Sequence, residues 1–352
     1  MRNAIALYEE ACKRDDAHSG YYNRNVRVPS DDGAVMVRIP TPGSDSMDLT
    51  MWREQDLLDA IRAYVGSAPQ LLHAQSDPPF QIHEFIEGDL LDDVCPAGTP
   101  IPDRVFHGIQ DLFGQLLRVP SGKLPGAPEG WPEDGDTVGF AGRLFALVRD
   151  IRAAGDGPTQ ELYRELGVPE DPCAFLVRAA GDLQSRPFRL LHADIHRKNI
   201  IVGPARTVFL DWELALWGDP VYDLADHLHK MAYLPDEEKR MRAAWAAAAP
   251  AECRAGWAAD VRFYLAYERM KSAVVDTVRW ARLISAATTE AERRTFAREL
   301  GAKFDAARPF WGPDARTASQ PADFERAAAR WARRTARHRS SGSAPHPPPS
   351  GQ

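Results

Sequence analysis

Two aspartates and an asparagine lie close to short apolar runs in the middle of the chain. Asp194 follows a leucine pair, Asn199 comes five residues later, and Asp211 ends a further apolar run twelve residues beyond that. Short apolar runs bounded by polar turns are typical of buried strands. Oxygen ligands at the ends of strands suit Mg²⁺, a hard cation that shares a few protein oxygens with substrate phosphates. The three residues therefore predict a magnesium site beside a phosphate group.

The spacing of these residues also assigns a role to each of them. In protein kinases an Asp accepts the proton of the acceptor hydroxyl, while an Asn five residues on and a later Asp hold metal ions. The same spacing predicts transfer of a phosphoryl group from a nucleotide to the hydroxyl of a small molecule. Lys198 lies inside the same loop and is a candidate to steady the transferring group. A solvated loop lysine is the alternative.

A cation and a carboxylate towards the N-terminus fit the nucleotide side of such a site. Arg38 lies near the end of an apolar strand, where a cation needs solvent or a partner. Glu54 follows sixteen residues later, in a helix expected from Met47 to Tyr64. In kinases a Lys–Glu pair of this kind orients the cation onto the phosphates, and Arg adds a bidentate fork. We expect an Arg38–Glu54 ion pair, with a hydrated helix face around Glu54 as the alternative.

The segment Phe80–Gly88 is expected to be a strand that ends in a glycine and opens onto a helical region. In a two-lobed kinase the lobes join at this point, and adenine meets exposed main-chain groups there. The Glu84 carbonyl and the Ile86 amide are therefore the expected adenine partners. A turn at Ser19–Asn25 precedes the first strand and is a candidate to cover the phosphates, although an ordinary surface turn has the same composition.

Composition and charge exclude several classes of protein. The chain is 44% hydrophobic and 26% charged, as in ordinary globular proteins, and no apolar run reaches the length of a membrane span. The N-terminus is acidic where a secretion signal needs an apolar core. A net charge of −7 argues against nucleic acid as a partner. We expect a cytoplasmic monomer or homodimer that binds neither membranes nor nucleic acid. Four cysteines, without metal or redox spacing, agree with a reducing compartment: Cys12, Cys95, Cys173 and Cys253.

The order of strand and helix patterns predicts an α+β fold. Strand patterns dominate up to residue 87, and apolar stripes of helical period dominate after it. We expect a small N-terminal nucleotide-binding lobe with an antiparallel sheet (1–87), followed by a larger, mainly helical lobe (88–337). The second lobe would carry the catalytic loop and the acceptor site. Residues 338–352, rich in Ser, Gly and Pro, are expected to be disordered.

With these residues in view, the sequence resembles the aminoglycoside phosphotransferase and choline kinase superfamily, the small-molecule relatives of protein kinases. The resemblance covers residues from about 19 to 285. Its strongest part consists of three blocks in order: His192-x-Asp194-x₄-Asn199, Phe209-Leu-Asp211-Trp-Glu213 and Gly218-Asp-Pro-x-x-Asp223-Leu-Ala. Three linked blocks are more specific than any one of them.

The resemblance implies a bilobal protein-kinase-like fold, ATP or GTP as donor and Mg²⁺ as cofactor. It also implies that Asp194 is the catalytic base, that Asn199 and Asp211 bind metal, and that Arg38, supported by Glu54, contacts the α- and β-phosphates. The sequence departs from the family in having Arg rather than Lys at the strand position and no multiple-glycine pattern in the loop at residues 19–25. Within that loop Asn23 and Asn25 are both candidates for phosphate contact.

Two other functions use some of the same residues. A metal-dependent hydrolase would use His192, Asp194 and His196 as ligands, but it would leave Asn199 and the Arg38–Glu54 pair without a role. A nucleotide-binding pseudokinase would lack part of the catalytic set, and nothing essential is missing here. Both therefore rank below a phosphotransferase.

The acceptor is specified less well than the reaction. In the superfamily an acidic groove receives cationic acceptors, and the chain carries acids and aromatic residues that could form one; the candidates are Asp226, Glu268, Tyr267 and Trp280. Solvated acids and core aromatics are the alternative. A composition rich in Ala, Arg, Gly and Pro is typical of bacteria in which such kinases inactivate antibiotics. An aminoglycoside, basic peptide or nucleoside antibiotic is therefore the leading acceptor, with choline, homoserine or a sugar as the alternative.

Overall fold

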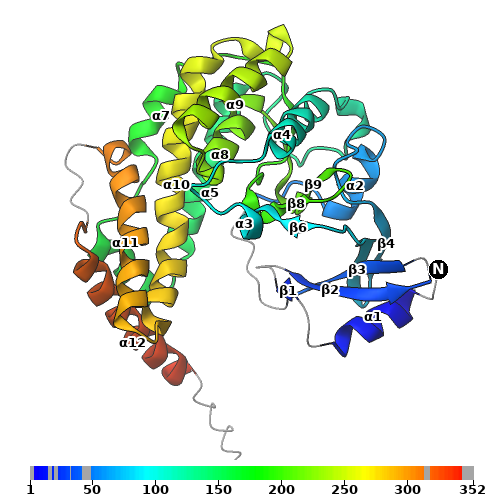
Figure 1. Ribbon diagram of the computed structural model, residues 1–352. Helices are drawn as coiled ribbons and strands as arrows, with labels where there is room; N and C mark the ends of the chain where they lie inside the picture. Colours follow the sequence, from blue (N-terminus) through cyan, green and yellow to red (C-terminus); the bar gives the residue numbers. More distant parts are fainter. Residues whose placement is uncertain are drawn as a thin grey trace, which may run out of the picture. The chain divides into compact units, whose positions relative to one another are not determined.

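A computed structural model describes residues 4–14, 18–19, 23–31, 33–41, 49–312 and 318–342 of the chain. Helices form most of it, and the largest of its three sheets is a five-stranded antiparallel sheet near the N-terminus (Figure 1). The expected α+β class is therefore confirmed. Among the described residues, no helix is both long and apolar enough to cross a membrane.

The chain divides into two compact units. Unit 1 comprises Met1–Phe140 and Gln184–Val261, and unit 2 comprises Ala141–Leu183 and Arg262–Gln352. All the sheets belong to unit 1, whereas unit 2 is helical. The lobe boundary expected at residue 87 falls inside unit 1 and stays a prediction.

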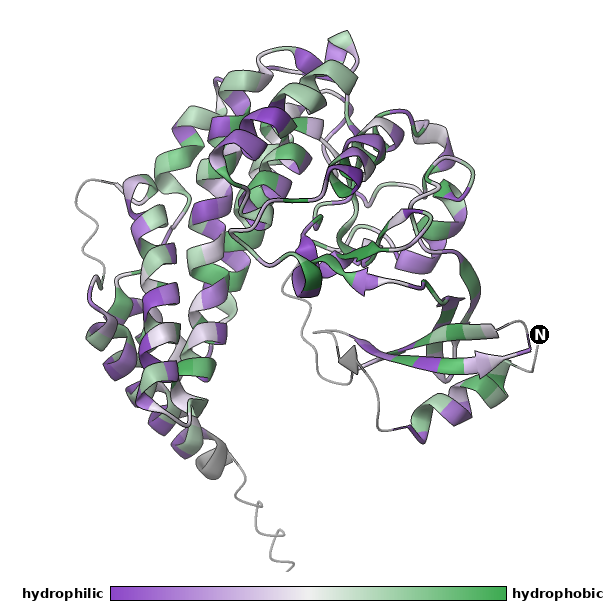
Figure 2. Cartoon of the chain, viewed as in Figure 1, coloured by the Kyte–Doolittle hydropathy of each residue, from purple (hydrophilic) through white to green (hydrophobic). Residues whose placement is uncertain are grey.

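The five-stranded sheet of unit 1 has the strand order β1-β2-β3-β5-β4, and its neighbouring strands pair antiparallel. In β2 and β3, both drawn in Figure 2, buried residues alternate with more exposed ones: Val26 and Val28 are buried in β2, and Val35 and Val37 in β3. This alternation is the pattern of a sheet that buries one face. The strands are β1 (His18–Ser19), β2 (Asn23–Ser30), β3 (Gly33–Pro40), β4 (Leu71–Ser76) and β5 (Pro79–Glu84).

The two faces of this sheet have different tasks. One face packs on helix α1 (Ala4–Cys12) and forms an apolar cluster, whose strand members include Val26, Val37 and Ile82. Because side chains alternate along a strand, the residues between them point to the other face. There the register places Asn25 opposite Arg38, and Arg38 opposite Gln81. The sheet thus presents the expected phosphate-binding cation on the face away from its core.

The remaining strands of unit 1 form two small sheets, and Asp194, Asn199 and Asp211 lie next to their strands. Gly88 has φ +139° and lies so close to β8 that a Cβ there would stand 2.7 Å from the Val202 carbonyl oxygen, so the approach requires glycine. The pairing of β10 with β7 was not expected from the sequence. One sheet has the order β6-β8-β9 and the other pairs β7 with β10; their bounds are β6 (Asp89–Leu90), β7 (Arg189–Leu191), β8 (Ile200–Val202), β9 (Thr207–Phe209) and β10 (Leu216–Gly218).

The helix expected from Met47 to Tyr64 is shorter in the structure, where it spans Glu54–Ile61. Unit 1 also holds α2 (Glu54–Ile61), α3 (Leu91–Val94), α4 (Asp103–Leu116), α8 (Pro220–Met231) and α9 (Pro235–Ala248). Unit 2 holds α6 (Gly157–Leu166), α7 (Ala174–Ala180), α11 (Glu290–Ala307) and α12 (Pro321–Gly342). The boundaries of the units fall inside α5 (Thr137–Ala154) and α10 (Trp257–Ala286). Short 3₁₀ helices are η1 (Ser121–Lys123), η2 (Arg197–Asn199), η3 (Trp212–Leu214), η4 (Ala251–Arg254) and η5 (Arg308–Phe310).

Helix α12 closes unit 2 by packing on α6 and α11. Its Arg330 and Arg334 both pair with Glu165 of α6, at 2.9 and 2.7 Å. The helix runs to Gly342, so the start of the disordered tail expected at residue 338 falls inside it. Residues 343–352 lie outside the described part of the chain.

A buried ion cluster fixes the beginning of helix α8. The Arg186 guanidinium, which is fully buried, donates twice to Asp219, at 3.0 and 2.8 Å, and once to Asp260. Asp219 caps α8 by accepting from the Val221 amide at 3.0 Å, and Pro220 occupies the first helical turn. Arg186 thus holds the helix that supports the central motif.

We expect Arg186→Met to lower the free energy of unfolding by about 3–5 kcal/mol, because two buried carboxylates lose their cation. Chemical denaturation followed by tryptophan fluorescence measures the loss. Arg149→Met is the matched control, since Arg149 pairs with Asp171 at an exposed position and about 1 kcal/mol or less is expected there. Equal losses in the two variants would contradict this account of the cluster.

Candidate active site

Asp194 lies at the centre of a hydrogen-bonded loop between β7 and β8. One carboxylate oxygen accepts from the Lys230 ammonium at 2.7 Å. The other accepts from the Asn199 amide nitrogen at 2.8 Å and lies 3.4 Å from His196 Nε2. Both carboxylate oxygens are thus held. Asp194 and Asn199, which are five residues apart in the sequence, are in direct contact.

Helix α8 fixes the main chain of this loop through Asp223. The Asp223 carboxylate accepts from the backbone amides of His192 and Ala193, at 3.1 and 2.7 Å. Ala193 has φ +59°, a left-handed conformation that costs a residue with a Cβ about 1–2 kcal/mol. Burial raises the pKa of Asp223 to about 7, although the two amides favour its ionised form. The carboxylate therefore stabilises a strained turn directly before Asp194.

Two further side chains anchor the loop at other points. His227 of α8 is buried and bonds through Nδ1 to the Ile195 carbonyl oxygen at 3.0 Å. Arg197 is also buried, and it donates to the carbonyl oxygens of Met231 and Cys95 at 3.0 and 2.5 Å. The loop is therefore bonded to the helix behind it and to the segment after α3.

The environment keeps Asp194 ionised. Burial opposes the charged form, but the Lys230 ammonium and the His196 ring outweigh it and hold the pKa of Asp194 well below its usual range. A carboxylate with such a low pKa is a weak base. Asp194 can therefore orient a hydroxyl by accepting its hydrogen bond, and it takes the proton only after the new bond has largely formed.

A second cluster surrounds Arg38. Its guanidinium donates to Glu54 at 2.7 Å and to Asp211 at 2.8 Å. Burial disfavours the charge on Arg38, but Glu54 and Asp211 more than compensate and raise its pKa. The other connection of Glu54 is to the Trp212 amide, at 3.0 Å. Asp211 has φ +66°, which Asp tolerates better than most residues, and this turn follows β9 immediately. The expected Arg38–Glu54 pair is therefore present.

Glu213 shows that the Arg38 cluster fits a cation. Three carboxylates, those of Glu54, Asp211 and Glu213, act electrostatically on Arg38, so two negative charges are in excess when all three are ionised. Burial raises the pKa of Glu213 to about 8, and Asp211 and Glu54 add to this effect. Its Oε1 atom is buried without a hydrogen-bond partner in the described part of the chain. A divalent cation would satisfy this oxygen and balance the charge, and its oxygen ligands suit Mg²⁺.

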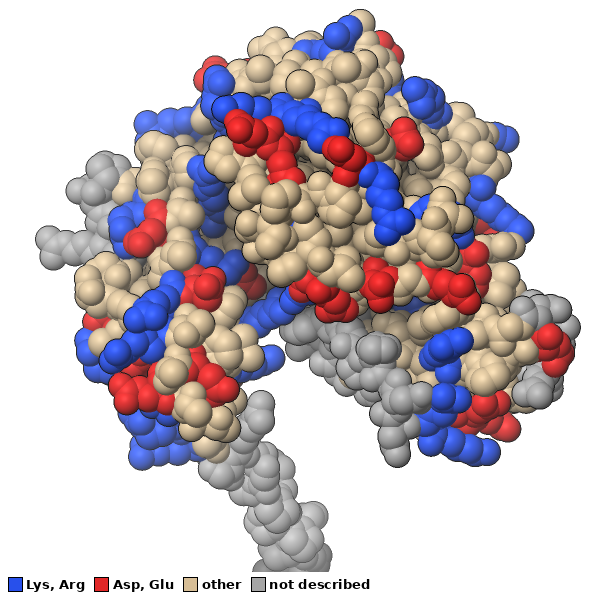
Figure 3. Space-filling model, in the orientation of Figure 1, with Lys and Arg blue, Asp and Glu red and all other residues tan. Residues whose placement is uncertain are grey.

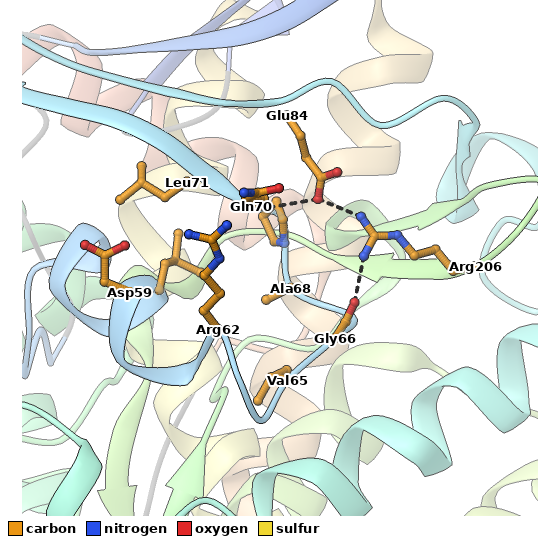
Figure 4. Close-up of a pocket in the computed structure, with 11 residues that line it drawn as sticks. Asp59, Arg62, Val65, Gly66, Ala68, Gln70, Leu71, Glu84 and Arg206 are labelled. Atoms are coloured by element: carbon orange, nitrogen blue, oxygen red, sulfur yellow. Dashed lines mark hydrogen bonds and ion pairs between the residues drawn. The ribbon is translucent and has the colours of Figure 1, made fainter.

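The other residues expected on the nucleotide side lie nearby in the sheet. Asn23 donates to Glu213 at 3.4 Å, and Asn25 lies opposite Arg38 on the adjacent strand. The Glu84 carboxylate, at the end of β5, lies between the Gln70 amide and Arg206, at 2.8 and 2.6 Å (Figure 4). Gln70, Glu84 and Arg206 are among the residues that line a pocket of about 290 Å³. Their contacts fix the chain two residues before Ile86. The adenine contacts expected for Glu84 and Ile86 stay predictions.

Lys198 lies apart from the Asp194 contacts. Its side chain is 67% exposed, and its nearest charged partner is Asp92 at 4.0 Å. The catalytic role expected for Lys198 stays a prediction, and the cation that contacts Asp194 is Lys230.

The four residues expected to bind the acceptor are largely buried. Asp226, in unit 1, is fully buried and lies 2.9 Å from Lys230. In unit 2, Glu268 is fully buried and pairs with Lys271 at 2.7 Å, and Tyr267 donates its buried hydroxyl to the Leu144 carbonyl oxygen at 3.0 Å. Trp280 is half-buried beside Phe296. Their role in acceptor binding stays a prediction, and the two acids offer no exposed negative surface for it.

Two residues on the polar face of α8, His227 and Lys230, are the part of the site that escaped prediction. Asp223, His227 and Lys230 follow at i, i+4 and i+7, a spacing that places them on one face of a helix. Polar residues at this spacing in an otherwise buried helix are the signal that could have found them. His192, the first residue of the motif, donates its backbone amide to Asp223, and its ring packs on Trp212 with 4.4 Å between centroids.

Comparison with known proteins adds the family. The model of a family described as the phosphotransferase enzyme family matches residues 16–271. No curated protein matches the chain. The match spans every residue of the two clusters around Asp194 and Arg38.

Solved structures with the same fold are similar over nearly the whole chain. A choline/ethanolamine kinase family protein from Mesorhizobium loti has a TM-score of 0.53 and 16% identity, over 93% of this chain and 96% of its own. A thermostable mutant of an aminoglycoside phosphotransferase has a TM-score of 0.55 and 14% identity, over 87% and 99%. A Plasmodium vivax ethanolamine kinase has a TM-score of 0.54 and 14% identity, over 90% of each chain. At this identity they establish the fold, and the kinase-like architecture expected from the sequence is confirmed.

The raised pKa of Glu213 predicts how stability depends on pH. Between about pH 4.5 and 8 the folded protein keeps a proton on Glu213 that the unfolded chain releases, so stability contributed by this proton is lost as the pH rises through this window. Glu213→Gln removes the effect. In EDTA we expect the free energy of unfolding of the variant to rise by about 1 kcal/mol relative to that of the wild type when the pH is raised from 5 to 8. This change is smaller than the free energy that corresponds to one unit of pKa shift.

Denaturant titrations at the two pH values measure this gain. Glu299→Gln, at an exposed position of α11, serves as the control and should follow the wild type at both values. A Glu213→Gln variant that stays parallel to the wild type would contradict the assignment of excess negative charge to the Arg38 cluster.

Proposed function

This chain belongs to the phosphotransferase enzyme family, and we propose that it transfers the γ-phosphoryl group of ATP or GTP to a hydroxyl group of a small molecule. The observation that carries this proposal is the pair of clusters in unit 1. One holds an ionised carboxylate, Asp194, by both oxygens, and the other gathers Arg38, Glu54 and Asp211. The first suits an acceptor hydroxyl and the second suits the phosphates of a nucleotide.

Arg38 is the nucleotide-side residue of the proposed site. In the structure its two terminal nitrogens are shared between Glu54 and Asp211. Glu54 keeps the guanidinium in place from behind, so the group can turn its remaining donors to the α- and β-phosphates. Asn23 and Asn25 lie at the same side of the sheet, where their amides can donate to phosphate oxygens. The sheet and α2 together pre-organise these donors, which is most of what a loose phosphoryl-transfer transition state requires.

Asn199, Asp211 and Glu213 are the residues that would hold Mg²⁺. The Asn199 amide nitrogen is bonded to Asp194, which leaves its oxygen as the ligand. Asp211 uses one oxygen for Arg38, and Glu213 keeps a buried oxygen for a cation. Mg²⁺ held by these residues would supply positive charge that neutralises the charge developing on the phosphates. The protein's part is to hold these oxygens together in a cluster with excess negative charge.

Asp194 is the residue that receives the acceptor hydroxyl. Its side chain is 15% exposed, so it is reached from solvent on one side while its oxygens stay bonded to Asn199 and Lys230. The hydroxyl oxygen forms a bond to the γ-phosphorus as the bond to the leaving nucleotide breaks, and the hydroxyl proton passes to Asp194. This order suits a carboxylate of low basicity.

The hydrolase alternative has little support in the geometry. The His192 ring, one of the three ligands that the hydrolase would need, is fully buried against Trp212. A phosphotransferase uses Asp194, Asn199, Arg38 and Glu54 together, which neither the hydrolase nor a pseudokinase requires.

The proposed acceptor is an antibiotic, and a primary metabolite is the alternative. Solved structures with this fold include an aminoglycoside phosphotransferase and choline or ethanolamine kinases, so the fold serves both classes. On the face shown in Figure 3 basic and acidic side chains are interspersed. The expectation of a cationic acceptor rests on the superfamily resemblance.

Replacing Asp194 with Asn should separate catalysis from nucleotide binding. We expect the turnover number to fall by about 10²- to 10⁴-fold, because the hydroxyl loses the carboxylate that orients it and takes its proton. The affinity for Mg-nucleotide should change less than about threefold by calorimetry, and Asp103→Asn at the surface should leave both values unchanged. A variant that keeps wild-type turnover would rule out this role for Asp194.

Identification of the acceptor needs a panel of hydroxyl compounds. We expect an aminoglycoside, basic peptide or nucleoside antibiotic to gain the mass of one phosphoryl group with Mg-ATP or Mg-GTP, and no gain when EDTA is added. Choline, ethanolamine, homoserine and sugars form the second arm of the panel. A product in the second arm alone would replace the antibiotic by a metabolite and leave the phosphotransferase proposal standing.

A further inference from the structure

Lys230 makes two hydrogen bonds to the Asp194 loop and an ion pair within its own helix. Its ammonium donates to the Ala193 carbonyl oxygen at 3.0 Å and to Asp194 at 2.7 Å, and it lies 2.9 Å from Asp226. The residue comes from the last turn of α8 and lies outside the three sequence blocks around Asp194, Asp211 and Asp223.

Lys230 holds one of the two carboxylate oxygens of Asp194, and residues of the loop hold the other. One oxygen is held from within the loop, by Asn199 at 2.8 Å and by His196 at 3.4 Å. The other is held by Lys230 at 2.7 Å. Without Lys230 the carboxylate would keep one anchored oxygen and could rotate about its Cβ–Cγ bond.

Lys230 also separates two carboxylates. Asp226 is fully buried and Asp194 is 15% exposed, and the Lys230 ammonium contacts both. Like charges in a region of low dielectric repel each other strongly, so loss of the cation would push Asp194 away from Asp226. Orientation and charge balance thus act in the same direction.

We propose that Lys230 is a positioning residue for phosphoryl transfer, which holds Asp194 at the angle where it meets the acceptor hydroxyl. This inference rests on the proposed function. Lys230 acts through Asp194 and has no acceptor lone pair while it is protonated, so the hydroxyl proton still passes to Asp194. Its contacts with Ala193, Asp194 and Asp226 belong to the cluster on the acceptor side, and we therefore expect nucleotide binding to depend little on it.

The test uses water as the acceptor, since the natural acceptor is unidentified. Wild-type protein is incubated with Mg-ATP, and release of ADP and inorganic phosphate is measured; water oxygen bonds to the γ-phosphorus and the bond to ADP breaks. We expect Lys230→Ala to lower kcat by about 10- to 100-fold, as a misplacement of about 1 Å does. The KM for ATP should stay within about threefold of the wild-type value.

Chemical rescue distinguishes positioning from a general structural role. Lys230 is 22% exposed, so a small amine can reach the space that the variant leaves. Ethylammonium, which has N–H donors, should restore at least a third of the lost kcat of Lys230→Ala, whereas tetramethylammonium, which has none, should not. Lys303→Ala is the matched control, because Lys303 also pairs with a carboxylate, Asp276, at a partly buried position and should keep full activity.

A second variant covers the case in which Lys230→Ala fails to fold. Lys230→Ala combined with Asp226→Asn removes both the cation and the buried charge that it balances, and it should fold with the same loss of kcat and the same amine rescue. Full activity in either folded variant, or a loss that ethylammonium does not restore, would overturn the role of Lys230. A wild-type protein that neither hydrolyses Mg-ATP nor phosphorylates any compound of the acceptor panel would instead overturn the proposed function itself.

Discussion

The active site depends on the hydrogen bonds that one carboxylate, that of Asp223, accepts from the main chain directly before Asp194. Two backbone amides, those of His192 and Ala193, donate to it, and Ala193 keeps a left-handed conformation that it would not adopt freely. The hydrogen bonds to Asp223 offset this strain, because Asp223 lies on α8, whose beginning is fixed by Arg186 and Asp219. The geometry of the reacting carboxylate is thus set by a helix that begins some twenty-five residues later in the sequence.

The same electrostatic arrangement occurs three times in unit 1. Arg38 bridges Glu54 and Asp211, Arg186 bridges Asp219 and Asp260, and Lys230 bridges Asp194 and Asp226. In each case one cation binds two carboxylates, so the cluster keeps an excess negative charge. The clusters serve different ends: beside Arg38 the excess negative charge favours a further cation, beside Asp194 the Lys230 cation keeps the carboxylate ionised, and around Arg186 the charges fix a helix. Burial strengthens all three, because charges interact more strongly where water is excluded.

Much of this could be predicted from sequence where the signal was local. The five-residue spacing of Asp194 and Asn199 predicted that they serve one site, and the two side chains are in contact. The Arg38–Glu54 pair was also predicted, because the sequence pattern indicated a strand around Arg38 and a helix around Glu54. The α+β class followed from the change of period near residue 88.

Contacts that depend on the packing of distant segments could not be predicted in this way. Lys230 looks like an ordinary polar residue near the end of a helix, and only tertiary structure brings it to Asp194, thirty-six residues earlier. Lys198 is closer in sequence yet points to solvent, because the 3₁₀ turn η2 directs Arg197 and Asn199 inward instead. Asp226 was expected to receive a ligand, and it is fully buried beside Lys230. Proximity in sequence is therefore a poor guide to which lysine serves the site.

The bridge made by Lys230 has a consequence for how this chain can change over evolutionary time. Asp226 is tolerable in the interior because Lys230 stands one helical turn away, and Lys230 is held in turn by Asp226 and Asp194. A substitution at position 230 alone strands a buried charge, and a substitution at position 226 alone loosens the lysine. The two positions are therefore coupled energetically, so a change at one alters which residues the other can tolerate.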